Sequence, residues 1–232
     1  MAITNEHGQP VGPPLGDWAP PGFPDGRALV GERVELEPLT WERHGEDLAD
    51  ELMAAPGSHW TYMGFGPFAD VAGLEGTIRA MAEPGDRLPY AILMGGRAAG
   101  VASYMRIDER MGVLEIGSIV LGPTLQRTTE ATEALYLMIR NTFDMGYRRC
   151  EWKCDDLNEP SRSAALRLGF TYEGTFRLAT HYKGRSRDTA WYAITVDDWP
   201  RLRNAFESWL APENFDDHGR QRKSLSELRS ET

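Results

Sequence analysis

The stretch TLQRTTEATEAL, Thr124 to Leu135, decides how the fold is interpreted. It follows GVLEIGSIVLG (112–122), an apolar run typical of a strand, and from Thr128 its apolar residues recur with helical spacing. Exposed backbone N–H groups at a helix start bind anions, and small side chains let a phosphate approach that backbone closely. The stretch therefore favours a phosphate site, although a Thr-rich first turn is also the ordinary composition of a helix cap.

The sequence before this stretch predicts one strand, two helices and three strands. RVELEPL (33–39) alternates as a half-buried strand does, and Thr40 caps a helix over 41–55. A weaker helix is expected over 70–83. Three strand-like runs between 88 and 122 are separated by the turn signals GGR and DERMG, which predicts an antiparallel meander.

The sequence after it predicts a helix, a strand, a short helix, two strands and a last helix. The first helix runs from Thr128 to Gly146, and YRRCEWKC (147–154) is the strand. PSRSAALRL (160–168) is the short helix, strand-like alternation fills 170–194, and an amphipathic helix is expected over 196–210. This order indicates an α+β fold around one mixed sheet.

The 232 residues are enough for one domain with flanking segments. We expect a Pro/Gly-rich extended arm over 1–31, a single domain over 32–210 and a charged, disordered tail over 211–232.

Charge narrows the classes of partner. A net charge of −10 disfavours nucleic acids and anionic membranes, and suits a cationic or amine substrate. No apolar run is long enough to span a membrane and no secretory signal is present, so a cytoplasmic protein is predicted. Cys150 and Cys154 have neither zinc-ligand spacing nor a disulfide framework, and are expected to be buried, reduced thiols on the same face as Trp152.

A second motif is NEPSRSAALRLGFTYEG, Asn158 to Gly174. Together with the opening stretch it resembles the Gcn5-related N-acetyltransferase (GNAT) superfamily, in its ribosomal-protein N-terminal acetyltransferase-like branch, over roughly 33–194. The resemblance implies a mixed, mostly antiparallel sheet of about seven strands flanked by helices. It also implies acetyl-CoA as co-substrate and no metal.

The resemblance implies where CoA binds. The family's Q/R-x-x-G-x-G/A loop, which holds the pyrophosphate, is similar to Gln126, Thr129 and Ala131. Thr129 stands where the family prefers Gly, so either the loop widens or the Thr129 hydroxyl bonds the pyrophosphate. The expected CoA contacts are Ile119, Val120, Leu121, Gln126, Arg127, Thr128, Thr129, Glu130, Ala131, Thr132 and Asn158.

The resemblance also implies catalytic residues. Glu115 stands eleven residues before Gln126, as the family's base does, although a strand Glu is equally often a solvent-facing ion-pair partner. The family's usual leaving-group Tyr is replaced by Ala165. Ser161 is expected to donate to the departing sulfur, or to cap the helix that follows.

For the acceptor site the resemblance points to the loop after the first helix, with Trp60, Tyr62 and Phe65, and to His181 and Tyr182 near the end of the domain. Each of these side chains has an alternative role in packing or at the surface. An Arg187–Asp188 pair, also similar to this branch, has the alternative role of stapling a hairpin.

The function implied is acetyl transfer from acetyl-CoA directly to a primary amine of a small molecule, peptide or protein N-terminus. Two alternatives remain: a non-catalytic acyl-CoA sensor with the same fold, and a transferase of a longer or acidic acyl group. A homodimer is plausible for this branch.

Overall fold

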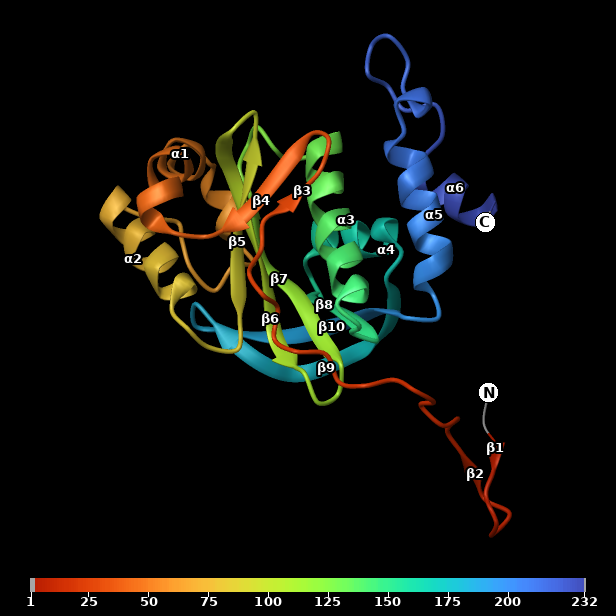
Figure 1. Ribbon diagram of the computed structural model, residues 1–232. Coiled ribbons are helices and arrows are strands. Elements are labelled where there is room, and N and C mark those ends of the chain that lie inside the picture. The colour runs from red at the N-terminus through yellow and green to blue at the C-terminus, as the bar shows by residue number, and fades with distance from the viewer. Residues whose placement is uncertain (1–2, 232) are drawn as a thin grey trace.

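The computed structural model describes residues 3–231. An eight-stranded sheet forms its centre (Figure 1), in the order β3-β4-β5-β6-β7-β8-β10-β9. The strands are β3 (Leu29–Val30), β4 (Val34–Pro38), β5 (Leu88–Met94), β6 (Arg97–Asp108), β7 (Val113–Leu121), β8 (Arg149–Asp155), β9 (Thr171–Tyr182) and β10 (Arg185–Thr195). Strands β7 and β8 pair in parallel, and the other neighbours are antiparallel. The mixed α+β sheet and its β5-β6-β7 meander confirm the prediction; the strand beyond the expected seven is the two-residue β3.

Helices cover both faces of this sheet (Figure 1). They are α1 (Trp41–Met53), α2 (Val71–Ala82), α3 (Thr129–Asp144), α4 (Glu159–Leu168), α5 (Trp199–Leu210) and α6 (Leu225–Glu231). Helices α1 and α2 lie on one face, and α3 with α4 and α5 lies on the other. In the described part of the chain, no helix is long and apolar enough to cross a membrane.

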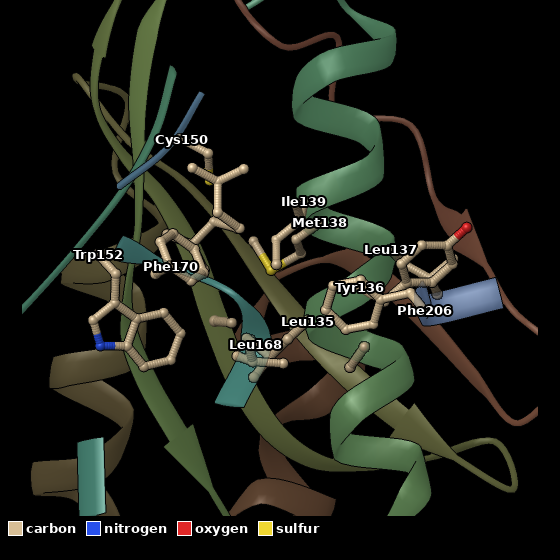
Figure 2. Packing of buried hydrophobic residues seen from close by; sticks show 14 of the residues in the cluster. Leu135, Tyr136, Leu137, Met138, Ile139, Cys150, Trp152, Leu168, Phe170 and Phe206 are labelled. Carbon is tan, nitrogen blue, oxygen red and sulfur yellow. The ribbon is translucent and has the colours of Figure 1, made fainter. Parts of the chain in front are cut away.

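The larger core lies under α3. Side chains of α3 pack on Cys150, Trp152 and Phe170 (Figure 2). The two cysteines, Cys150 and Cys154, are free and buried. Alternation along a strand sends neighbouring side chains to opposite faces. Residues of β7, β8 and β10 that do not face α3 therefore point toward the other side of the sheet, which is called the acceptor side below.

Side-chain caps fix where three helices begin. Thr40, Asp70 and Thr128 each accept a hydrogen bond from the backbone N–H three residues later. Gly169 ends α4 with φ +98°, and a Cβ there would lie 2.6 Å from Leu202 Cδ2. A left-handed backbone and a close neighbour both favour glycine at this position.

The two flanking segments are more structured than expected. The arm forms a small hairpin of β1 (Ile3–Thr4) and β2 (Pro10–Val11) that projects from the body (Figure 1). It then returns to the sheet as β3, with Leu29 buried. The segment 211–231, expected to be disordered, contains a 3-10 turn and α6, because Leu225 is buried against the core and can offset the entropy of ordering. The domain boundaries themselves stay a prediction.

Candidate active site

Strands β7 and β8 separate in the middle of the sheet. They pair over Val113–Glu115 and Arg149–Glu151, and no further pairs join them in the described residues. The rest of β7 keeps its pairing with β6, and a bulge with Ser118 at φ +48° lies at the separation. Apart from the Leu121 carbonyl, which Gln126 holds, the β8-facing side of residues 119–121 is thus without a strand partner and can pair with an extended ligand.

The start of α3 offers an anion site. Backbone N–H groups of four consecutive residues, 127–130, have no acceptor among the described residues. Thr128 caps the helix by accepting from Ala131 N–H at 3.1 Å, and its hydroxyl donates to Leu125 O at 2.7 Å. Unpaired N–H groups and the positive end of the helix dipole attract a phosphate. These groups fit the pyrophosphate of CoA.

The side chain of Gln126 connects this loop to two other elements. Its Nε2 donates to Leu121 O at 2.9 Å and lies 2.9 Å from His59 Nδ1. Burial lowers the pKa of His59, so its neutral ring can accept this hydrogen bond. Gln126 thus occupies one carbonyl that was expected to hold the pantetheine arm of CoA.

The remaining predicted CoA contacts of this helix have different surroundings. Thr129 and Glu130 are half-buried at the first turn, whereas Thr132 is buried and accepts from Arg167 of α4. The Thr129 side chain makes no hydrogen bond with the described residues, which leaves its hydroxyl available to a ligand.

Asn158 and Ser161 lie together at the start of α4. Asn158 Oδ1 accepts from Ser161 N–H at 3.2 Å, so Asn158 caps the helix and the expected capping role of the Ser161 hydroxyl is wrong. The Ser161 Oγ instead accepts from Trp152 Nε1 at 3.0 Å. Because that bond uses an oxygen lone pair, the O–H stays a donor. Ala165 has only a methyl side chain, so no leaving-group acid stands at that position, and the residue is fully buried.

Glu115 lies on the face away from α3, buried and ion-paired. It is 6 % exposed, so it does not face solvent, but the ion pairing expected by the alternative role is present. Lys153 Nζ lies 2.6 Å from Glu115 Oε2, and Arg106 Nε lies 3.7 Å from the same atom. Burial raises the pKa of Glu115, while Lys153 and Arg106 act in the opposite direction. A carboxylate with a raised pKa is a better proton acceptor near neutral pH.

The predicted acceptor residues divide into those packed in the core and those on the β9–β10 hairpin. Trp60 is 2 % exposed and packs with Phe65 and Phe68 in the core under α1 and α2. Tyr182 donates to Asp155 Oδ2 at 2.6 Å, and its pKa is raised to about 12, chiefly by burial and by Asp155.

The β9–β10 hairpin and the loop after α1 are joined directly. Lys183 Nζ donates to Trp60 O at 2.7 Å and to Phe65 O at 3.1 Å. His181 is exposed and makes no hydrogen bond with the described residues. Lys183 therefore joins the two predicted acceptor segments, which are called the acceptor wall below; Tyr182 belongs to it.

Sequence reasoning missed the partners of Glu115. Lys153 and Arg106 come from β8 and β6, and Trp191 of β10 lies beside both cations, 4.6 Å from Lys153 Nζ and 5.4 Å from Arg106 Cζ. Alternation on YRRCEWKC places Lys153 opposite the buried cysteines, but only the strand register places it beside Glu115.

The separated parallel pair, the unpaired N–H groups at α3 and the buried carboxylate are features that fit an acyl-CoA-dependent acyltransferase. The family model of the acetyltransferase (GNAT) domain matches residues 33–171, so the chain belongs to this family, whose members use acetyl-CoA. No group of His, Cys, Asp and Glu in the described residues is arranged to hold a metal ion.

Solved structures agree with this assignment. A GCN5-related N-acetyltransferase from Brucella melitensis is 41 % identical, with a TM-score of 0.90, over 93 % of this chain and 100 % of its own. The microcin C7 self-immunity acetyltransferase, solved with acetyl-CoA and AMP, is 25 % identical, with a TM-score of 0.63, over 72 % of this chain and 94 % of its own.

An acetyltransferase from Salmonella typhimurium that modifies the N-terminal serine of a ribosomal protein shares the fold. It is 21 % identical, with a TM-score of 0.64, over 74 % of this chain and 100 % of its own. No curated protein gives a match to this sequence.

Proposed function

We propose that the protein transfers an acetyl group from acetyl-CoA directly to a primary amine of a small molecule, peptide or protein N-terminus, in a ternary complex. The observation that carries the proposal is the separation of β7 from β8 immediately beyond Glu115. This separation supports a binding position for the thioester arm beside the buried carboxylate of Glu115.

The residues have separate roles in the transfer. The amine nitrogen forms a bond to the acetyl carbon, and the carbon–sulfur bond breaks. Glu115 takes the proton that the amine loses, directly or through water. Ser161 donates a hydrogen bond to the departing sulfur, with its orientation set by Trp152 Nε1. A hydrogen bond suffices there because the thiol of CoA has a pKa near that of cysteine, about 8.5, so its thiolate leaves without full protonation.

The cofactor end is held by the first turn of α3. Backbone N–H groups of 127–130 bind the pyrophosphate, and the Thr129 hydroxyl is a further donor to it. Gln126 has to release Leu121 O when the pantetheine arm bonds that carbonyl, and this movement also releases His59.

Acetyl-CoA titration by calorimetry tests the cofactor half of this proposal. The same preparation is then assayed for thiol release against amines and N-terminal peptides. Binding followed by release with one class of amine supports the enzyme and identifies its acceptor class. Absence of acetyl-CoA binding by the folded protein refutes the proposal.

A non-catalytic acyl-CoA sensor is the second candidate, because buried Ala165 supplies no acid to the leaving group. It predicts acetyl-CoA binding with no thiol release for any amine in the panel. Enzyme and sensor are therefore separated by the second step of the same experiment.

A further inference from the structure

Buried polar atoms without a partner gather on one face of the sheet. Apart from ion-paired Glu115, the buried side-chain N and O atoms without a hydrogen-bond partner in the described residues are Ser103 Oγ, Arg187 Nε and Trp191 Nε1. Each costs free energy unless a ligand or solvent satisfies it.

Their positions follow from strand alternation and contacts. On β10, Ala190 and Tyr192 belong to the core under α3, so Trp191 between them points to the acceptor side. Ser103 lies between Ala102 and Tyr104 of the same core and also points away from α3. All these atoms therefore lie on the side of the sheet that carries Glu115.

Trp191 lies one side chain away from the proposed base. Lys153, which pairs with Glu115 at 2.6 Å, lies 4.6 Å from the Trp191 ring centroid. An indole N–H is a donor only. A ligand bound near Glu115 that satisfies this group must bring a hydrogen-bond acceptor, such as an oxygen.

Arg187 is a cation without a carboxylate partner among the described residues. Its guanidinium lies 6.0 Å from the ring centroid of Tyr182, on the acceptor wall. The two acidic residues nearest in sequence and register are engaged elsewhere: Asp155 by Tyr182 and Leu157 N–H, and Asp188 by Leu178 N–H at 2.7 Å. Of the Arg187–Asp188 pair, whose alternative role was to staple a hairpin, Asp188 therefore has this role and Arg187 does not.

We propose that a carboxylate of the substrate binds to Arg187, and that Trp191 Nε1 donates to a substrate oxygen between this carboxylate and the reacting carbon. Four residues of strand span about 13 Å, so the carboxylate lies several bonds from the reacting carbon. It is carried either by the acceptor amine or by the acyl group of the acyl-CoA. This inference rests on the proposed function, since it places the ligand on the same side of the sheet as Glu115.

Phe176 packs on the Trp191 ring beside the proposed ligand position. Its ring centroid lies 4.9 Å from that of Trp191, and the residue is 59 % exposed. Displacing an exposed ring loses little packing.

Binding to the full chain, measured by calorimetry, tests the two sources of the carboxylate separately. The acyl arm compares 3-oxoadipoyl-CoA with 3-oxohexanoyl-CoA, which has the same chain length and oxo group but no terminal carboxylate. The acceptor arm titrates triglycine and triglycine amide into protein saturated with acetyl-CoA. We expect the carboxylate to improve affinity about tenfold in one arm, the effect of a charge-assisted hydrogen bond.

Variants then locate the contact. Arg187→Gln is expected to abolish the preference for the carboxylate, while Arg185→Gln, an exposed arginine of the same strand, keeps it. Trp191→Phe keeps the ring and removes the N–H, and is expected to weaken the preferred ligand about two- to tenfold. It also serves as the test if Arg187→Gln fails to give a cooperative melting transition.

The outcomes separate this inference from the proposed function. Equal affinity within both pairs, or a preference that survives Arg187→Gln, overturns the carboxylate site while acetyl-CoA binding stands. Failure of the folded protein to bind any of the acyl-CoAs overturns the proposed function and this inference with it.

Discussion

Replacing Glu115 with Gln removes the proposed base with little change of shape. General bases typically contribute about 10²- to 10⁴-fold to rate, equivalent to about 3–5 kcal/mol of activation free energy. The value within this range depends on the acceptor. An α-amine with a pKa near 7.8 is about 14 % neutral at pH 7, whereas a lysine with a pKa near 10.4 is about 0.04 % neutral. We therefore expect a loss of kcat of about 10²-fold for an α-amine and up to about 10⁴-fold for a lysine-like amine.

The pH dependence gives a sharper signature. Glu115 must be deprotonated to accept a proton, and its pKa is raised mainly by burial. Activity should therefore fall as pH decreases through a value above the ordinary Glu pKa of about 4.3. Lys153 lowers that pKa, so Lys153→Met should move the acidic limb to higher pH. Thiol release measured from pH 5 to 9 gives both profiles.

The pH dependence of stability provides an independent check of the direction in which the pKa of Glu115 is shifted. A raised carboxylate pKa means that the contribution of Glu115 to stability is complete below about pH 4.3 and is lost as pH rises through its pKa in the folded protein. The variant Glu115→Gln lacks this loss. The difference in unfolding free energy between variant and wild type should therefore shift in favour of the variant between pH 4 and pH 7, in urea titrations at each pH.

The matched control is Glu35→Gln on β4, a half-buried strand carboxylate that forms no ion pair or hydrogen bond with the described side chains. We expect it to leave kcat unchanged. The reasoning about the base is refuted if Glu115→Gln retains wild-type kcat, or if the acidic limb is the same in wild type and Lys153→Met.

Three further outcomes are expected. Glu133 accepts backbone N–H bonds from all three residues 32–34, so Glu133→Gln should lower the unfolding free energy by about 2–4 kcal/mol in urea; a loss below about 0.5 kcal/mol would contradict this role. Lys183→Met should raise the KM for the acceptor and leave the Kd of acetyl-CoA unchanged, because Lys183 joins only the acceptor segments; an equal change in both would refute that separation. Cys150 and Cys154 should resist a thiol reagent until the protein is denatured, since burial raises the pKa of both thiols, and rapid labelling of the native protein would contradict their placement.

Local patterns predicted the elements well because helix and strand periods and caps are local properties. Thr40 and Thr128 precede helices that begin at Trp41 and Thr129, within a residue of the prediction. The segment 211–231 was expected to be disordered because its charge gives no local sign of packing. The contact that orders it, burial of Leu225, joins distant parts of the chain.

The candidate site divides in the same way. The sequence by itself determined the helix start with its unpaired N–H groups, because a cap residue and a run of small side chains are adjacent in the chain. Only the tertiary structure decided that Glu115 is buried against Lys153 and that Gln126 bonds Leu121 and His59. Strand register and loop packing set these pairs, and neither is encoded in the spacing of the residues involved, since a one-residue shift in register would send Lys153 to the other face.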